Sequence, residues 1–250
     1  MKIKKLVITP SNYIYKIEHL NRSISLHEGH IDREALINID YEGIVETSKG
    51  EKLLLAPATF KDQLESIKRK AAIIIPKDLG FIISETGLTK ESVILDVGGG
   101  SGAVTCQLAA LCKKVYSFDI NPEHVKVIKT NCEDMELNNV ELKELDIKKI
   151  KFPETIPEQV DLAVIDVPEP LEAIPMLDKV VKQSGFIVFY TPHISQAQQV
   201  VEKLDSNYKI ITVIELIQRR WEVENKLLRP KHNMLGHTAF LTIVRKFLRP

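Results

Sequence analysis

The sequence predicts an α/β fold: a Rossmann-like parallel sheet with a C-terminal antiparallel hairpin, preceded by a small all-β domain. Three observations predict it. From Glu91 onward, strand-like and helix-like segments alternate regularly, which is typical of a parallel sheet covered by helices. Near the C-terminus two long β runs follow each other. Before residue 67, short strand patterns lie between turn signals. We therefore expect a small β domain over 1–66 and a larger domain over 67–250.

The N-terminal region has two stretches of alternating β pattern, KIEHLNRSISLHEG and DYEGIVETSKGEKLLLAP. Turn signals occur at Glu28–Gly29, Glu42–Gly43 and Lys49–Gly50. Short alternating runs between such signals predict small strands. A helix is expected over 59–70, where Phe60, Leu64 and Ile67 share one face. Another is expected from about Asp78, because an acidic side chain favours the positive end of a helix.

The larger domain alternates between the two element types. Strands are expected near 93–97, 115–119, 140–145, 161–165 and 185–190, and helices near 103–112, 122–136, 171–183 and 194–205. The β runs 209–221 and 237–246 have no helix of matching length between them. We expect these two runs to pair antiparallel as a hairpin that closes the sheet edge.

Composition restricts the possible functions. The 250 residues include 34 Lys and Arg against 34 Asp and Glu, so a nucleic-acid enzyme would have to gather its basic residues on one face or by oligomerisation. Cys106, Cys112 and Cys132 form no C-x-x-C pair with a matching histidine set, which argues against zinc. The N-terminus lacks the features of a signal peptide and no segment approaches a membrane span. We expect a cytoplasmic protein with reduced thiols.

The stretch VILDVGGGSG, residues 93–102, is the most informative in the chain. A buried-strand pattern leads into alternating glycines, Gly98, Gly100 and Gly102, and an apolar helix pattern follows. A strand, a glycine-rich turn and a helix form a nucleotide-type cofactor site at the carboxyl edge of a parallel sheet. The motif alone does not identify the cofactor, because Gly98, Gly100 and Ala103 also fit the spacing of dinucleotide folds.

Acidic residues narrow the choice. Asp96, Asp119, Asp146 and Asp166 each stand at the tip of one of four successive predicted strands. Each one alone could be the N-cap of the following helix, but four at equivalent positions indicate a site. S-adenosylmethionine (SAM) has an ammonium group and ribose hydroxyls that suit acids, and it has no pyrophosphate for them to repel. These acids and the terminal hairpin favour a SAM-dependent methyltransferase domain over a dinucleotide dehydrogenase.

Three further stretches carry a family resemblance: IIIPKDLGFII, VIDVPEP and RRWEVENKLLRPKHNMLGHTAFLTIVRK. Together with the N-terminal β module they resemble the TrmI family, the tRNA (adenine-N1)-methyltransferases that act on adenosine 58 of the T-loop. The resemblance covers about residues 28 to 247, and its most specific part leads from Arg229-Pro230-Lys231 to Gly236-His237-Thr238. The compact length is similar to that of archaeal members. The resemblance implies a homotetramer that binds folded tRNA, with the adjacent adenosine 57 as a second site in archaeal relatives.

The resemblance also implies roles for individual residues. Within the glycine motif, which includes Asp96 and Gly98, the cofactor's methionine end would be lined by Gly100, Ser101, Gly102 and Ala103. Asp119 matches the family's ribose-binding acid, and His124 lies where some relatives contact the cofactor adenosine. Asp146 matches the acid near the cofactor adenine. Asp166 matches the catalytic aspartate of the D-x-P motif.

The chain also departs from the family pattern. Relatives usually have an aromatic residue or histidine before Pro-Lys-Asp, where this chain has Ile75, and a glutamine where it has Ala72. Asp96 stands where Glu is more frequent. The first two differences bear on how the target base is held and on the range of targets, and all three leave the SAM site intact.

Methyl transfer to N1 of adenine needs no strong base, because N1 already has a lone pair. Methylation makes the base cationic, and a fixed carboxylate beside the exocyclic amine stabilises that charge and accepts a proton. Asp166 is the candidate. The T-loop adenine must also be extruded from the folded tRNA. Candidate phosphate contacts, each of which alone could be a solvated surface charge, are Lys68, Arg69, Lys70, Lys77, Arg219, Arg220, Arg229, Lys231 and Arg245.

Three other residues have mainly structural interpretations. We expect His237 to fix the hairpin, His193 to start a helix, and Trp221, with Phe240, to lie in the core or a subunit interface. Two alternative functions stay open from the sequence. One is a precorrin-type small-molecule SAM methyltransferase, against which the β module and the Arg229–Thr238 motif argue. The other is a non-catalytic tRNA-binding subunit, which would be expected to lose glycines or strand-tip acids.

Overall fold

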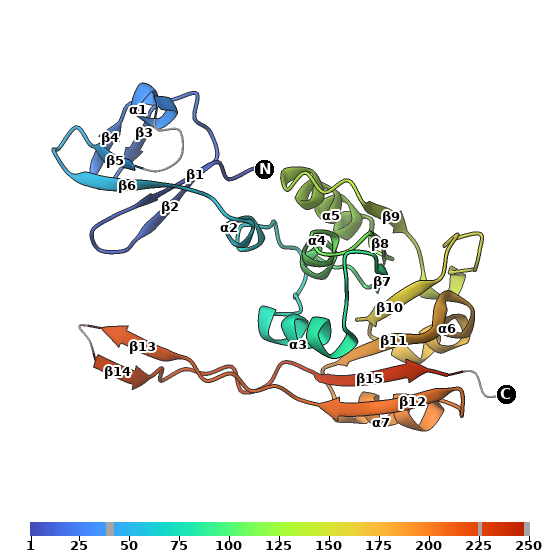
Figure 1. Cartoon of the computed structure of the whole chain (residues 1–250). Helices are drawn as coiled ribbons and strands as arrows, with labels where there is room; N and C mark the ends of the chain where they lie inside the picture. The colour runs from blue at the N-terminus through green and yellow to red at the C-terminus, as the bar shows by residue number, and fades with distance from the viewer. Residues whose placement is uncertain (39–42, 225–226, 248–250) are drawn as a thin grey trace. The chain divides into compact units, whose positions relative to one another are not determined.

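The computed structural model describes residues 1–38, 43–224 and 227–247 (Figure 1). The chain divides into two compact units. One unit comprises Met1–Lys68 with Glu133–Glu136, and the other comprises Arg69–Cys132 with Leu137–Pro250. The smaller unit contains two antiparallel sheets and the larger one a mixed sheet with helices, so the α/β fold class with an additional N-terminal β region is confirmed.

The smaller unit is built on a four-stranded antiparallel sheet in the order β2-β1-β6-β5. Its strands are β1 (Lys5–Ile8), β2 (Ile14–Ile17), β5 (Gly43–Glu46) and β6 (Lys52–Pro57), and a second pair is formed by β3 (Ile24–Leu26) and β4 (Gly29–Ile31). Fully buried Val7, Ile31 and Leu55 lie in its core. Gly43 begins β5, whereas Glu42 of the predicted turn lies outside the described residues.

Two short helices of this unit differ from the expectation. Helix α1 (Arg33–Asn38) interrupts the expected all-β pattern, because fully buried Leu36 places one face of this turn in the β core. Helix α2 (Phe60–Leu64) begins with a capping box, in which the Thr59 backbone N–H donates to the Asp62 carboxylate at 2.8 Å. The helix predicted over 59–70 is therefore much shorter, and buried Ile67 lies beyond its end.

The larger unit contains a seven-stranded sheet in the order β12-β15-β11-β10-β7-β8-β9 (Figure 1). Its strands are β7 (Val93–Val97), β8 (Lys114–Asp119), β9 (Val140–Glu144), β10 (Val160–Ile165), β11 (Val181–Thr191), β12 (Tyr208–Ile214) and β15 (Phe240–Lys246). The five strands from β11 to β9 pair parallel, and β15 pairs antiparallel with both β11 and β12. The predicted C-terminal hairpin at the sheet edge is therefore confirmed.

The helices of this unit are α3 (Pro76–Thr86), α4 (Ala103–Ala109), α5 (Pro122–Asp134), α6 (Ile174–Val180) and α7 (Ile194–Lys203). One face of the sheet packs on α3 and α4 through Leu79 and Leu108. The other face packs on α6 and α7 through Leu177 and Val200. All five residues of β7 are buried, as expected for a central parallel strand covered on both sides.

Two boundaries near the C-terminus were wrong. The helix expected over 171–183 is a 3-10 turn, Pro170–Ala173, followed by α6, and β11 begins already at Val181. The β run expected over 209–221 stops at Ile214. A separate ribbon of β13 (Trp221–Glu224) and β14 (Leu227–Pro230) follows, with Trp221 opposite Pro230. The consecutive polar residues Gln218, Arg219 and Arg220 separate the two parts and interrupt the run that was predicted as one strand.

Among the described residues no group of His, Cys, Asp and Glu is arranged to hold a metal ion. No helix of the described chain is long and apolar enough to cross a membrane. All three cysteines are buried, and the sulfurs of Cys106 and Cys132 lie 3.8 Å apart.

Candidate functional site

A cavity of about 650 Å³ opens at the carboxyl edge of the parallel strands. Four successive strands contribute to its lining, because the loops after β7, β8, β9 and β10 all emerge at this edge. The lining includes Gly98 and Gly100, His124, and the acids Asp119, Asp146 and Asp166. Its volume lies within the roughly 300–1,000 Å³ usual for small-molecule sites.

The glycine turn after β7 brings two strand ends close together. Gly98 has φ +89°, and a Cβ atom there would lie 1.9 Å from the carbonyl oxygen of Asp166. Only glycine allows this backbone angle and this approach without displacing β10. Gly102, with φ +80°, is the N-cap of α4 and packs against Ile128. The glycines thus set the distance between the turn and Asp166.

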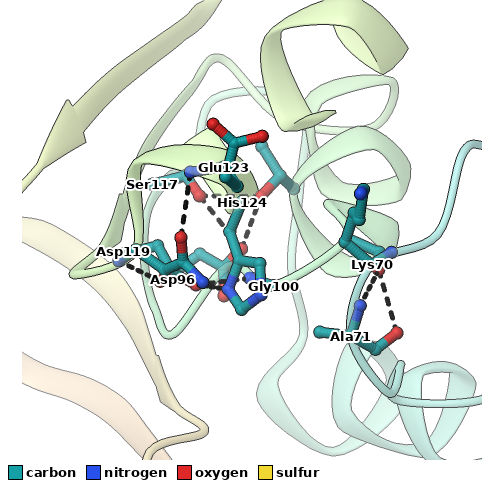
Figure 2. Close-up of polar contacts among 11 residues, drawn as sticks. Lys70, Ala71, Asp96, Gly100, Ser117, Asp119, Glu123 and His124 are labelled. Atoms are coloured by element: carbon teal, nitrogen blue, oxygen red, sulfur yellow. Dashed lines mark hydrogen bonds and ion pairs between the residues drawn. The ribbon is translucent and has the colours of Figure 1, made fainter. Parts of the chain in front are cut away.

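Asp119, at the end of β8, is buried and surrounded by donors (Figure 2). The backbone N–H of Gly100 donates to its Oδ2 at 2.8 Å, and that of Asn121 donates to its Oδ1 at 2.8 Å. The His124 Nδ1 lies 3.1 Å from Oδ2. Asp119 therefore joins the glycine turn to the start of α5, and its carboxylate also faces the cavity.

The structure does not place Asp96 and Ser101 on the cavity wall. Asp96 is 1% exposed and lies under the turn, where the Thr105 hydroxyl donates to its Oδ2 at 2.6 Å (Figure 2). Burial raises the pKa of Asp96 to about 6, against hydrogen bonds from Thr105 and Ser117 that lower it. The Ser101 hydroxyl instead accepts from the backbone N–H of Lys70 and Ala71, at 3.0 and 2.9 Å, and donates to the Ala71 carbonyl. Asp96 and Ser101 therefore hold neighbouring segments of the site in place without lining the cavity themselves.

The sequence did not predict that the Lys70–Ala72 segment, which Ser101 holds, forms part of the site. Ala71 and Ala72 line the cavity, and a Cβ on Gly100 would lie 3.3 Å from the Ala71 Cβ. Nothing in the local sequence indicates this contact, since 30 residues separate Ala71 from Ser101. Gly102 and Ala103 do not belong to the cavity lining and instead begin α4.

The far wall of the cavity combines apolar side chains with one acid. Ile120, Leu145 and Ile147 lie in the wall beside half-buried Asp146. One carboxylate oxygen of Asp146 accepts from the Lys148 backbone N–H at 3.0 Å and caps the turn Ile147–Lys149. Here the N-cap interpretation and the site interpretation both apply to the same residue.

Asp166, at the end of β10, differs from the other acids. Its backbone N–H donates to the Val97 carbonyl at 2.9 Å, but within the described chain its carboxylate receives no hydrogen bond. Burial, with added repulsion from Asp96 and Asp119, raises the pKa of Asp166 to about 7. A carboxyl group near half-ionisation at neutral pH is suited to accept a proton.

The basic candidates are in different environments. The Lys77 side chain is 8% exposed and its ammonium group lies within the fold. Arg245 donates to the Ser184 carbonyl at 3.1 Å and lies over the rings of Phe186 and Phe247. The enclosed Lys77 is not available to a tRNA phosphate, so its assignment as a phosphate contact was wrong, whereas the half-buried Arg245 stays a prediction. Exposed candidates of the larger unit are Arg69, Lys70, Arg219, Arg220, Arg229 and Lys231.

The histidine and aromatic expectations give mixed results. His237 fixes the base of the hairpin as expected, with Nδ1 on Glu215 and Nε2 2.8 Å from the Pro192 carbonyl oxygen. His193 is the N-cap of α7. Phe240 is half-buried, and its ring centroid lies 5.0 Å from that of His237. Trp221 is 55% exposed on β13, which excludes a place in the core of this chain.

The cavity residues fit SAM. Three aspartates and Glu169 line it, and its one lysine, Lys148, lies 3.7 Å from the Glu169 carboxylate. A pyrophosphate would be repelled by this set of acids, whereas an ammonium group, a sulfonium and ribose hydroxyls suit it. The apolar wall around Ile120 and Leu145 matches a flat heteroaromatic ring. The donors on Asp119 leave lone pairs on each oxygen for further hydroxyl groups.

The sheet order, the glycine turn and the strand-end acids define the Rossmann-like methyltransferase class. A SAM-dependent O-methyltransferase of Thermotoga maritima superposes with a TM-score of 0.86 at 25% identity, over 100% of this chain and 94% of that one. The tRNA (m1A58) methyltransferase TrmI of Aquifex aeolicus superposes with a TM-score of 0.82 at 23% identity, over 99% and 98%.

Sequence comparison narrows the class to a family. Residues 64–228 match the family described as tRNA methyltransferase complex GCD14 subunit, and the chain belongs to this family. A TrmI of Methanocaldococcus jannaschii, named a tRNA (adenine(57)-N(1)/adenine(58)-N(1))-methyltransferase, is 34% identical over 232 residues. That match covers 82% of each chain.

Proposed function

We propose that this protein transfers a methyl group from SAM to N1 of adenosine 58 in the T-loop of tRNA, and to the adjacent adenosine 57 where one is present. One observation supports the proposal above the others. The carboxylate of Asp166 lines the cavity without a donor within the described chain, whereas the other two lining aspartates, Asp119 and Asp146, accept from backbone N–H groups. The family match and the TrmI relative supply the class of acceptor.

The residues that would hold SAM follow from the cavity. Asp119 is placed for the ribose hydroxyls, with His124 beside it, and Asp146 with the apolar wall for the adenine. Gly98 and Gly100 allow a ligand to approach the main chain at the turn. When bound, SAM supplies an electrophilic methyl group on a sulfonium. The chain's task is then to align the acceptor and exclude water.

Asp166 performs the acid–base work in this proposal. Methylation at N1 leaves the adenine cationic and makes its exocyclic amine acidic. The Asp166 carboxylate stabilises that charge and accepts a proton from the amine. Its raised pKa makes the ionised form a better base than an ordinary carboxylate, while about half of it is still ionised at neutral pH.

The partners follow from the same family. Arg219, Arg220 and Lys231, all exposed near the β13–β14 ribbon, are proposed contacts for tRNA phosphates. The apolar residues Val223, Leu227 and Leu228 on this ribbon are 63–74% exposed. An apolar surface of this kind supports self-association, and we propose a cytoplasmic homotetramer. In this scheme 67–250 is the methyltransferase domain and 1–66 an accessory β domain.

Nucleoside mass spectrometry tests the proposal. Purified protein is incubated with SAM and unmodified tRNA transcripts that carry G57–A58, A57–A58 or A57–G58. We expect 1-methyladenosine at position 58 of the first two transcripts and at position 57 of the two transcripts that carry A57. Absence of 1-methyladenosine from all three would overturn the proposal.

The rival functions give different results. A small-molecule methyltransferase would leave tRNA unlabelled and transfer the methyl group to a tetrapyrrole offered in its place. A non-catalytic tRNA-binding subunit would bind tRNA and show no SAM affinity in calorimetry. The intact glycine turn and all four strand-end acids disfavour the second rival, because such a subunit has no use for them.

A further inference from the structure

A buried charge cluster lies beside the site without belonging to the cavity lining. Its centre is Asp78, in the first turn of α3, which is 0% exposed. A buried carboxylate is costly unless it is paired and hydrogen-bonded. Asp78 has two partners: the Lys77 ammonium, 2.6 Å from Oδ1, and the Tyr190 hydroxyl, which donates to Oδ2 at 3.1 Å.

Lys77 completes the cluster. Besides Asp78, its ammonium donates to the Leu216 carbonyl at 2.7 Å and to the Thr238 hydroxyl at 2.9 Å. An ammonium has three N–H groups, and all three are accounted for by these contacts. Leu216 and Thr238 lie on the two segments that connect the seven-stranded sheet to the β13–β14 ribbon. The pair Lys77–Asp78 therefore ties α3 to both segments.

Tyr190 connects this cluster to the reactive carboxylate. It is the residue after Phe189 in β11, and Phe189 pairs with Ile165, the residue before Asp166 in β10. Tyr190 and Asp166 are thus neighbours across parallel strands. Burial, then the Asp78 charge, and to a lesser extent the Asp166 charge raise the pKa of the Tyr190 phenol. The hydroxyl stays protonated, and its one proton is donated to Asp78 rather than to Asp166.

We propose that Asp78 is a positioning residue that holds the Tyr190 proton away from Asp166, so that the reactive carboxylate keeps no donor from its neighbouring strand. The inference rests on the proposed function, in which Asp166 is the base. A phenol that donated to Asp166 would stabilise its ionised form and make it a weaker base. The charged Lys77 holds Asp78 in place for this task.

The other groups around Asp166 do not replace this control. Asp96 from β7 and Asp119 from β8 repel its ionised form. Asp146 and Glu169 line the same cavity, and Lys148 there is near Glu169 and Glu172. Among the described residues around the Asp166 carboxylate, Tyr190 on the adjacent strand carries a hydroxyl that already donates its proton to another anion, Asp78.

The test is a carboxyl carbon-13 NMR titration of Asp166 in the full chain, with the signal assigned by its loss in Asp166→Asn. We compare wild type, Asp78→Ala, Tyr190→Phe and the double variant Asp78→Ala/Tyr190→Phe. Asp78→Ala removes the acceptor of the Tyr190 hydroxyl, which then turns to Asp166, and the pKa of Asp166 falls by about one unit. Tyr190→Phe lacks the donor and keeps a value close to wild type, and the double variant returns to that value.

An unchanged titration in Asp78→Ala, or a fall that persists in the double variant, would overturn the inference. Asp78→Ala leaves the Lys77 ammonium without its anion, so Lys77→Met/Asp78→Ala is the replacement should the single variant fail to fold. It removes both charges, frees the same hydroxyl, and is expected to give the same fall.

Activity supplies the second readout. With tRNA and SAM, Asp78→Ala should lower kcat about tenfold and move the acid limb of the pH–rate profile to lower pH, with the calorimetric Kd for SAM within threefold of wild type. If Asp78 had only a structural role, its substitution would change folding without moving the acid limb of the pH–rate profile. If wild type forms no 1-methyladenosine, the proposed function fails, whereas the NMR titration still decides whether Asp78 controls the Tyr190 proton.

Discussion

Asp119 and Asp166 occupy equivalent places at the ends of neighbouring parts of one sheet, yet the chain treats them in opposite ways. Asp119 receives two backbone N–H groups at 2.8 Å and a histidine at 3.1 Å. Asp166 is buried and lies near two other acids, Asp96 and Asp119, and both effects raise its pKa to about 7. The same cavity thus holds one carboxylate that is supplied with donors and one that is deprived of them. This is the contrast expected between a carboxylate that binds a ligand and one that transfers a proton.

The largest effect is expected at Asp166. Asp166→Asn keeps the shape of the site and removes the base, so kcat should fall by roughly 10²–10⁴-fold, the usual contribution of a positioned acid or base. SAM affinity, measured by calorimetry, should change less than threefold. Retention of wild-type turnover by this variant would show that the donor-free carboxylate has no part in the chemistry.

Asp119 should show the converse behaviour. Asp119→Ala leaves the Gly100 and Asn121 N–H groups unpaired, and hydrogen bonds to charged groups contribute about 1.5–3 kcal/mol each. We expect the Kd for SAM to rise roughly 10–100-fold, at about tenfold per 1.4 kcal/mol. At saturating SAM the kcat should stay within a few-fold of wild type. Asp119→Asn, which retains one carbonyl acceptor, is the matched control. Its Kd for SAM should lie between those of wild type and Asp119→Ala.

The pH–rate profile separates the two carboxylates further. Only ionised Asp166 accepts a proton, so kcat/KM should rise with pH through about 7, its raised pKa. Asp96→Asn removes a negative charge that opposes this ionisation. The acid limb should then move to lower pH by less than about one unit, because one of several repulsive groups is lost. A shift to higher pH would contradict the assigned origin of the raised pKa.

The smallest effect is expected at Ser101, which holds the Ala71–Ala72 wall of the cavity. Ser101→Ala removes three hydrogen bonds to Lys70 and Ala71 and should lower stability by about 1–3 kcal/mol. For a chain of this size that corresponds to a fall in Tm of roughly 2–10 °C in a thermal scan. Ser92→Ala is the control, since Ser92 accepts from the Thr89 N–H outside the cavity lining.

The two serine variants differ in their expected effect on the cofactor. Both should lower the Tm, but only Ser101→Ala should raise the Kd for SAM, by a few-fold, because it loosens the Ala71–Ala72 wall. Equal SAM affinity in the two variants would mean that the segment tied by Ser101 does not shape the binding side.

Much of the larger unit was predictable because its signals are local. A strand covered on both faces gives a continuous apolar run, as in Val93–Val97, and a turn with positive φ demands glycine, as at Gly98. The acids at strand ends were found for the same reason. The β13–β14 ribbon was missed because β-forming residues occur on both sides of the short polar run Gln218-Arg219-Arg220, and the whole stretch was taken as one strand.

The site was predicted less completely than the fold. Asp96 and Ser101 belong to the right motif, but the sequence could not show which side of the turn faces the cavity. The Tyr190–Asp78 contact joins residues 112 positions apart, and no local pattern encodes it. The local sequence does not distinguish Lys77 from an exposed lysine. Only the packing of the fold shows that its ammonium is enclosed.

The sequence by itself determined the α/β architecture, the glycine turn and the row of acids, because backbone angles, apolar periodicity and strand order are properties of short segments. Tertiary structure decided which of these acids is supplied with donors and which one is left without them. That difference depends on desolvation and on donors contributed by distant segments: the Gly100 and Asn121 N–H groups on Asp119, and the Asp78 carboxylate that engages the Tyr190 proton beside Asp166. Electrostatic environment is a property of the assembled fold, and for that reason it could not be obtained from the order of residues alone.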